Sequence, residues 1–443
     1  MLQIAMLPLP AGPRQPSWWQ LLRWVRQPIA FLRECERHFG DTFTVRFPRM
    51  PPLVFMSHPD AVKDVFIGDP LKLSAGEANF VLKPLVGENS LLILDGQKHL
   101  GERRLMLPAF HGERMQNYGT VMREVTRQRI AAWPRGRVFA AHAETQAITL
   151  DIILRTVFGA DEESELAGLR NDIVALLDIL RNPMWLMPWF QRDLGRLTPW
   201  ARAVRLKASI DAAFFRLIAK RREEADSERK DILTLLLAAR YEDGTPMSDL
   251  SLRDEMMTLL VAGHETTATS LSWAINHILA TPRVLVRLRT ELAAASGDFS
   301  ATKLPYLEAI IKETLRLTPV IPLVGRLLAE PTAFGAEKLP AGAVATPAIY
   351  LAHLRRESWD QPEEFKPERF LDAKISPYQF FPFGGGARRC IGAAFAQYEM
   401  RVVLAELFGT DEKMRLQPGY RAKIVRRAIT FAPSRGVPIV LGE

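Results

Sequence analysis

The chain has very little cysteine and no long apolar run. Its 443 residues include two cysteines, Cys35 and Cys390, which are too few for the disulfide framework of a small secreted protein, so we expect a cytoplasmic location. No stretch approaches the roughly 20 consecutive apolar residues that a transmembrane helix requires. The first residues, Met1–Pro13, lack the basic start of a secretion signal.

The sequence also lacks the marks of a nucleic-acid-binding protein. Lysine and arginine total 58 against 50 aspartate and glutamate residues, a formal net charge of +8. The positive residues are scattered and form no dense block with interleaved aromatic residues. We therefore expect no nucleic-acid partner, and we interpret the positive excess as suited to an acidic protein partner.

No internal repeat or low-complexity linker divides the chain, so we predict one large domain over 1–443, acting as a monomer. The segment 1–30 is rich in proline and tryptophan. We expect this segment to pack against the body of the protein, with contact to a membrane surface as the alternative.

Apolar residues recur mostly at three- and four-residue spacing, which predicts a mainly α protein with minor β parts. Strand-like alternation is confined to three zones, of which the first suggests a hairpin: Thr42–Ser57, Gly325–Ile349 and Ala422–Leu441. Helices are predicted over Arg114–Trp133, Gln146–Phe158, Leu206–Glu224, Asp231–Arg240 and Ser251–Ala280, and from near Ile391.

Cys390 stands in an unusual segment, Phe380–Gly392, which contains the run Gly-Gly-Gly-Ala-Arg-Arg-Cys. Three successive glycines permit positive φ angles and remove the Cβ atoms that would separate the main chain from a neighbouring group. Arg388 and Arg389 add positive charge beside the sulfur, and the N-terminus of the helix from Ile391 points toward it. Both effects favour the thiolate. We predict a nucleophile or a metal ligand, the alternative being an inert buried cysteine.

The helix predicted over Ser251–Ala280 is also unusual. It runs for roughly 45 Å until Thr281-Pro282 ends it. Its middle reads Leu-Leu-Val-Ala-Gly-His-Glu-Thr-Thr-Ala-Thr, which places polar side chains where a protein core is expected, and such side chains need partners when buried. The segment is not a zinc-protease motif, because Ala268 stands where the second histidine is required. The polar insert indicates a functional site; an exposed helix face is the alternative.

The cysteine segment resembles the haem-ligand signature of the cytochromes P450. Phe383, Gly386, Arg388, Cys390 and Gly392 all fall where that family has these residues. The resemblance implies that Cys390 is the axial ligand of the iron in haem b. A cysteine thiolate on haem iron favours cleavage of the O–O bond.

The middle of the long helix resembles the oxygen groove of the same family, where the small residues Ala262 and Gly263 precede the acid–alcohol pair Glu265 and Thr266. The resemblance implies that the small residues leave room for dioxygen beside the haem and that the pair is catalytic. A hydroxyl such as that of Thr266 is both donor and acceptor, so it can hold a water molecule and pass protons.

Three further residues resemble the Glu-x-x-Arg pair of the family and its partner. Glu313 and Arg316 lie one helical turn apart, and Arg369 stands in a later Pro-Glu-Arg-Phe run. Such an ion pair, taken alone, contributes a few tenths of a kcal/mol. The resemblance implies a structural triad in which Arg369 bonds Glu313 and ties the haem-binding loop to the helical core.

Haem propionates need cationic partners, and the resemblance nominates His99, Arg103, Arg326 and Arg388. His99 and Arg103 stand at i and i+4, so they share one helix face. For Arg326, the alternative is a surface charge on an edge strand.

The resemblance implies the helix-rich cytochrome P450 fold with small β-sheets, a long oxygen-groove helix at 251–280, and a haem-thiolate loop with its following helix at 380–408. It implies a monooxygenase that hydroxylates a hydrophobic substrate such as a fatty acid, terpenoid or steroid with dioxygen. We expect electrons from a separate ferredoxin or flavodoxin-type donor with its NAD(P)H reductase. The donor is expected to dock near Lys98, Arg388 and Arg389.

Residues that face the substrate are less readable, because strongly apolar segments pack cores as often as they line pockets. The resemblance suggests Phe80, Leu85, Leu186, Val320, Leu323 and Phe431.

Three other functions remain open at this point. A peroxide-driven peroxygenase would usually carry arginine and proline in place of Glu265 and Thr266. A non-enzymatic haem sensor or carrier would not require the polar insert in the long helix. A cysteine-nucleophile enzyme would need a histidine base close to Cys390, which the sequence does not place.

Overall fold

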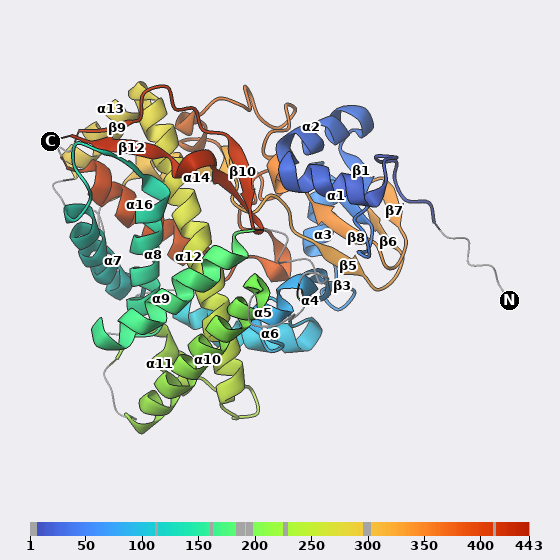
Figure 1. Ribbon diagram of the computed structural model, residues 1–443. Helices are drawn as coiled ribbons and strands as arrows, with labels where there is room; N and C mark the ends of the chain where they lie inside the picture. The colour runs from blue at the N-terminus through green and yellow to red at the C-terminus, as the bar shows by residue number, and fades with distance from the viewer. Residues whose placement is uncertain are drawn as a thin grey trace.

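Helices dominate the structure, and its largest sheet lies beside the first helices of the chain (Figure 1). The structure is a computed structural model that describes residues 7–110, 114–159, 163–182, 191, 198–224, 229–295, 303–410 and 413–442. The helices are α1 (Ser17–Arg26), α2 (Pro28–Phe39), α3 (Pro59–Ile67), α4 (Ala75–Ala78), α5 (Lys83–Val86), α6 (Gly96–Met106), α7 (Arg114–Ala131), α8 (Ala141–Thr156), α9 (Glu163–Leu180), α10 (Pro199–Glu223), α11 (Ile232–Ala238), α12 (Asp249–Ala280), α13 (Pro282–Ala294), α14 (Pro305–Leu317), α15 (Ile349–Ala352) and α16 (Ala393–Phe408). The predicted class, mainly α with minor β, is confirmed.

The five-stranded sheet has the order β1-β2-β8-β5-β3. Its strands are β1 (Thr42–Val45), β2 (Leu53–Met56), β3 (Leu73–Ser74), β5 (Arg326–Leu328) and β8 (Val344–Pro347). The hairpin predicted from alternation in the first zone is confirmed as the antiparallel pair β1–β2, and β2 then pairs in parallel with β8 from the second zone. A small hairpin of β6 (Thr332–Phe334) and β7 (Glu337–Leu339) lies between β5 and β8 in the chain.

The third predicted β zone forms an antiparallel hairpin and the last strand of the chain. We call the pair β10 (Ile424–Arg427) and β11 (Thr430–Pro433) the C-terminal hairpin. Strand β12 (Pro438–Leu441) lies between β4 (Val138–Ala140) and β9 (Met414–Leu416). The short strand β4 shows no alternation in the sequence that would predict it. It forms because it pairs with β12, about 300 residues later in the chain.

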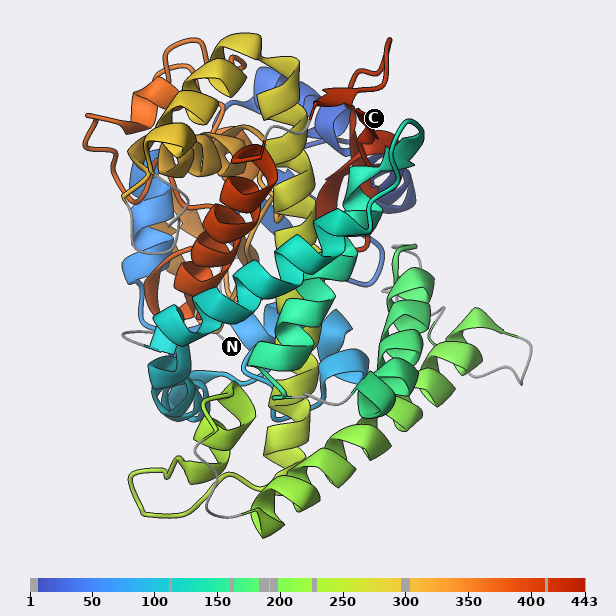
Figure 2. The same cartoon turned by 90° about the vertical axis from the view of Figure 1, so that its left-hand side faces the viewer.

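Helix α12 runs through the middle of the molecule, and α8 and α16 cross it (Figures 1 and 2). It is 32 residues long and begins two residues before its predicted start, where the Ser248 side chain caps the backbone amide of Ser251. It ends at Ala280, as predicted, before Thr281-Pro282. Most of the helix is buried, so its polar residues must find partners inside the protein.

Two helices begin earlier than their apolar periodicity indicates. Helix α8 starts at Ala141 and not at Gln146, and helix α10 starts at Pro199 and not at Leu206. The first turn of α8 has no side-chain cap and carries His142 in place of an apolar residue, so neither signal of a helix start is present in the sequence.

A buried ion-pair cluster joins α14 to the chain that leads to the loop carrying Cys390. Arg316 donates to both carboxylate oxygens of Glu313 at 2.7 and 2.9 Å, and Arg369 donates to one of them at 3.0 Å. Arg316 also donates to three backbone carbonyls within 353–364 and lies over the ring of Trp359 at 5.1 Å. Both side chains of the central pair are fully buried, so neither charge can be hydrated if its partner is lost.

We predict that Arg316→Met lowers the free energy of unfolding by about 3–5 kcal/mol, because it leaves a buried carboxylate and three carbonyls short of donors. The matched control is Arg287→Gln, which removes one ion pair to Glu368 from an arginine that is half exposed. That change should cost about 1 kcal/mol or less. Urea-induced unfolding at equal haem content measures both, and equal losses would show that the buried cluster adds no stability.

Candidate active site

The loop that carries Cys390 packs directly against α3. Gly386 has a φ of +65°, and a Cβ atom there would lie 2.0 Å from the carbonyl oxygen of Phe66. A Cβ atom on Gly385 would lie 2.2 Å from the ring of the same residue. The backbone amide of Cys390 donates to the carbonyl of Phe383 at 2.9 Å, which closes the loop. The glycines therefore permit the close approach predicted from the sequence, and the neighbour they approach is α3.

The protein alone does not favour a thiolate at Cys390. Burial raises the pKa of the thiol, and the Gly392 amide, Arg103 and Arg389 lower it by less than burial raises it. The helix amide and the charge of Arg389 favour the thiolate, as expected, but without a bound metal the desolvation outweighs them. Such a thiol becomes an anion when a metal ion binds it, which favours a ligand over a free nucleophile.

We expected Arg388 to add positive charge beside the Cys390 sulfur, but its guanidinium bonds the segment before α6. Its guanidinium donates to the carbonyl of Leu91 at 3.1 Å and also to the Leu94 carbonyl and the Asp95 carboxylate. Asp95 in turn accepts from the backbone amides of residues 75–77 at the start of α4. Arg388 therefore ties the cysteine loop to the segment before α6, and its side chain is only 10% exposed.

The four side chains predicted to meet the propionates lie together. Burial, together with the charges of Arg388, Arg103 and Arg326, lowers the pKa of His99 to about 3. Arg326 is 7% exposed and belongs to β5, which lies between two other strands, so the alternative of a surface charge on an edge strand is wrong. Burial and the neighbouring Arg388 lower the pKa of Arg326 to about 10.

These residues fit the haem group that the sequence implies. Three arginines converge here, and among the described residues Asp95 is the carboxylate that offsets Arg326 and Arg388. Buried positive charge of this kind requires anions, and the two haem propionates would supply them. The Cys390 sulfur would be the iron ligand, and His99 and the three arginines would hold the propionates.

The middle of α12 exposes surface inside the molecule. Ala262 is exposed although the helix on both sides of it is buried, and Thr266, one turn later on the same face, is partly exposed. Cys390 is likewise accessible. Ala262 and Thr266 would face the haem group, and we call the space beside these two residues the inner chamber. The Thr266 hydroxyl donates to the Ala262 carbonyl, which leaves its lone pairs available.

Glu265 lies on the side of α12 that contacts α8. Gln146 donates to its carboxylate at 2.6 Å, and His142 lies 3.5 Å from the other carboxylate oxygen. Burial works to raise the pKa of Glu265, but the hydrogen bonds from His142 and Gln146 help to bring it below its ordinary value. The acid is therefore held as a carboxylate in the interior.

A seam of hydroxyl and imidazole groups fixes α8 against α12. Thr145 donates to the Ala268 carbonyl at 3.0 Å, and Thr149 donates to the His264 carbonyl at 3.2 Å. The α8 partners of Glu265, which are His142 and Gln146, were not predicted from the sequence. A polar residue at every third or fourth position from 142 to 149 was the available signal.

The predicted substrate residues that the structure describes differ in their exposure. Phe80 is 37% exposed, while Leu85 and Val320 are buried and Leu323 is partly buried. Leu186 lies outside the described residues.

Phe431 is a core residue, which corrects its assignment as a pocket wall. Its ring packs with Trp24 at 6.1 Å and Tyr350 at 5.9 Å and is 1% exposed. Its backbone nevertheless holds other parts in place, because its carbonyl accepts from Trp273 at 3.0 Å and its amide donates to Val320 at 2.7 Å.

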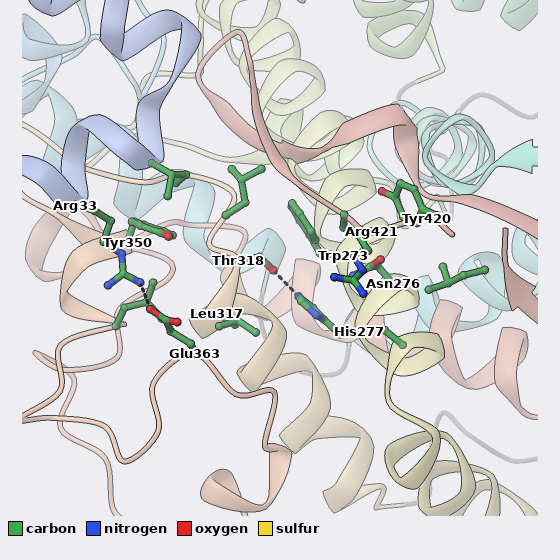
Figure 3. A pocket seen from close by; sticks show the side chains of 16 residues that line it. Arg33, Trp273, Asn276, His277, Leu317, Thr318, Tyr350, Glu363, Tyr420 and Arg421 are labelled. Atoms are coloured by element: carbon green, nitrogen blue, oxygen red, sulfur yellow. Dashed lines mark hydrogen bonds and ion pairs between the residues drawn. The ribbon is translucent and has the colours of Figure 1, made fainter. Parts of the chain in front are cut away.

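A separate pocket of about 620 Å³ lies toward the C-terminal end of α12 (Figure 3). Trp273 and His277 form one wall, and the ion pair between Arg33 and Glu363 lies across from them. Burial lowers the pKa of His277 to about 3, so this side chain is neutral and bonds Thr318 at 3.2 Å. None of the predicted substrate residues lines this pocket.

A model of the family described as Cytochrome P450 matches residues 10–410. The chain belongs to the cytochrome P450 family. It is 39% identical over 434 residues to cytochrome P450 135B1 of Mycobacterium tuberculosis, covering 97% of this chain and 91% of that protein. It is 36% identical over 435 residues to cytochrome P450 135A1 of the same organism, covering 98% and 95%.

A solved structure, cyanobacterial CYP120A1 with retinoic acid bound, has a TM-score of 0.86 and covers 98% of this chain and 99% of its own. Its 24% identity shows the fold alone. As a cytochrome P450, the protein is a monooxygenase with a haem-thiolate cofactor that uses dioxygen. Within the described residues, every helix is too short or too polar to cross a bilayer.

We predict that Gly386→Ala prevents normal haem incorporation in this cytochrome P450, because the new Cβ atom would meet the Phe66 carbonyl at 2.0 Å and the backbone φ is +65°. The penalty should be about 2 kcal/mol or more. Gly392→Ala is the matched control, since its Cβ would meet nothing within 4 Å and its φ is −86°. The ratio of haem absorbance to protein absorbance measures the effect, and equal ratios in both variants would contradict it.

Proposed function

We propose that this cytochrome P450 hydroxylates a C–H bond of a hydrophobic substrate, such as a fatty acid, terpenoid or steroid, with haem b as its cofactor. The observation that carries the proposal is the inner chamber, where Ala262 and Thr266 of α12 expose surface in an otherwise buried helix. The apolar segments predicted to face the substrate support a hydrophobic ligand. The retinoic acid bound to CYP120A1 is an isoprenoid acid, which agrees with the terpenoid class.

In this mechanism each residue has a separate task. Haem bound through a cysteine thiolate supplies the activation of dioxygen. Thr266 would hold a proton donor in the chamber, since its own hydroxyl hydrogen is engaged by Ala262 and its lone pairs are available as acceptors. Glu265, kept as a carboxylate by its α8 partners, would accept protons from outside the chamber and hand them toward Thr266.

We further propose that electrons come from a separate ferredoxin or flavodoxin-type donor with an NAD(P)H reductase. The exposed side chains of Lys98 and Arg389 suit an acidic partner. Arg388, which we expected on the same docking surface, is committed to Asp95 and is nearly buried, so we exclude it from that surface.

The acid–alcohol pair is the feature that separates a monooxygenase from its rivals. Glu265 has a hydrogen-bonded environment that holds its charge, and Thr266 faces the chamber. This arrangement supports proton delivery, which a haem carrier or gas sensor does not need.

We predict that Thr266→Ala binds haem normally but diverts reducing equivalents to hydrogen peroxide. Product formed per NAD(P)H consumed should fall by roughly tenfold or more, because the proton-handling hydroxyl is lost. Thr266→Ser keeps that hydroxyl and should retain most of the coupling. Turnover with a surrogate ferredoxin and reductase measures product, peroxide and NAD(P)H together, and unchanged coupling in the alanine variant would remove Thr266 from the mechanism.

We predict that at least one member of a panel of fatty acids, terpenoids and steroids shifts the ferric haem from low to high spin, because a ligand in the chamber displaces water from the iron. Titration by absorption spectroscopy gives the apparent affinity. Small polar alcohols serve as the control and should cause no shift. If the whole hydrophobic panel failed to shift the spectrum at saturating solubility, the proposed substrate class would be wrong.

A further inference from the structure

A line of contacts joins the C-terminal hairpin to the acid of α12. Arg427, the last residue of β10, lies with Nη1 3.1 Å from Nδ1 of His142. The other ring nitrogen, Nε2, lies 3.2 Å from the hydroxyl of Thr269 and 3.5 Å from the carboxylate of Glu265. Three elements distant in sequence, β10, α8 and α12, therefore meet at one imidazole ring.

The guanidinium selects the tautomer of this ring. Arginine carries only donors and stays charged, so Nδ1 of His142 must accept from Arg427. In the neutral ring the hydrogen then resides on Nε2, the nitrogen that faces Glu265 and Thr269. Removing Arg427 would allow the hydrogen to move to Nδ1, and Nε2 would then present a lone pair to the Glu265 carboxylate.

The charge of Glu265 depends on this ring. Burial is the largest influence on the acid and raises its pKa, while the hydrogen bond from His142 is the next largest and lowers it. Gln146 also donates to the acid, but its influence on the pKa is smaller. Loss of the Nε2 donor should therefore let desolvation raise the pKa of Glu265.

Arg427 lies next to the turn of the C-terminal hairpin. Ala428 follows with a φ of +49°, and the next residue, Ile429, is 37% exposed. The turn is held by its own hydrogen bonds, since the Ala428 amide donates to the Arg181 carbonyl at 2.9 Å and the Ala428 carbonyl accepts from Arg426 at 3.0 Å. Beyond the turn, the Phe431 backbone is anchored to Trp273 and Val320.

We propose that His142 is a positioning residue for Glu265 and that Arg427 of the C-terminal hairpin selects its tautomer, so that the position of the hairpin turn governs the hydrogen bonding of the acid. This inference rests on the proposed role of Glu265 in proton delivery. It adds a physical link between the C-terminal hairpin and the acid of α12.

Several charged or titratable groups surround this ring and the Glu265 carboxylate, whose pH titration is the quantity of interest. They are Glu265 and His264 on α12, His142 on α8, Arg427 on β10, and Asp178 and Arg181 at the end of α9. The pKa of His264 is lowered by burial, so it stays neutral. Since the pKa of Glu265 is below its ordinary value, the acid is charged at neutral pH and protonates only as pH falls.

The first test reads the tautomer directly in the haem-loaded protein. Nitrogen-15 NMR of histidine-labelled protein, in the diamagnetic ferrous carbon monoxide complex, distinguishes protonated from unprotonated ring nitrogens. The His142 signals are those lost in His142→Gln. We expect hydrogen on Nε2 in the wild type and a mixture of tautomers in Arg427→Gln. Hydrogen on Nδ1 in the wild type, or an unchanged ring in Arg427→Gln, would overturn the proposal.

The second test reads the acid. Infrared difference spectra against Glu265→Gln isolate the carboxylic acid band of Glu265, and its pH titration should move to higher pH in His142→Leu. His142→Gln keeps an amide donor near the position of Nε2 and should move the titration less. Lys423→Gln, an exposed change near the start of the same hairpin, is the matched control and should move nothing.

The third test separates this inference from the proposed function. Product per NAD(P)H should fall by about two- to tenfold in His142→Leu, less than in Thr266→Ala, because the acid is still present. If Glu265→Gln leaves coupling unchanged, the proposed role of the acid fails, while the tautomer and titration results still decide whether His142 positions it. A titration that is the same in wild type and His142→Leu would refute the positioning role even if turnover changed.

Discussion

The polar seam between α8 and α12 is the interaction on which the rest of the structure depends. Unpaired hydroxyls or carboxylates in this position would cost several kcal/mol each, and the threonines of α8 remove that cost by bonding carbonyls of α12. The seam also fixes the rotation of α12 about its axis. Since each residue advances about 100°, placing Glu265 against α8 leaves Ala262 and Thr266 to face the inner chamber.

Desolvation is a second constraint, because it acts on the protonation of the titratable side chains in the site. Burial raises the pKa of Cys390 and lowers the pKa values of His99 and Arg326. Each of these side chains is thereby pushed toward its neutral form, and the clustered arginines repel one another. A group that carries both a metal cation for the sulfur and carboxylates for the arginines relieves these costs together. This complementarity gives the haem assignment a physical basis in addition to the resemblance of motifs.

The C-terminal hairpin has a larger part than its length suggests. Arg427 of the hairpin donates a hydrogen bond to His142. The Phe431 backbone bonds both Trp273 of α12 and Val320, which follows α14 in the chain. The hairpin therefore contacts both the acid side of the long helix and the wall of the pocket in Figure 3. The Phe431 ring packs in the core. The apolar sequence around it is equally consistent with a core residue and with a residue that lines a pocket.

Sequence alone determined the family, the long helix with its polar insert and the hairpin over 42–57, because these depend on local periodicity and on residues close together in the chain. It could not determine that α8 begins at His142's turn, that β4 pairs with β12, or that Arg388 turns to Asp95. Those features arise from partners hundreds of residues apart. Only the tertiary structure decided that burial outweighs neighbouring charge at Cys390, because desolvation depends on everything packed around an atom and not on its neighbours in the chain.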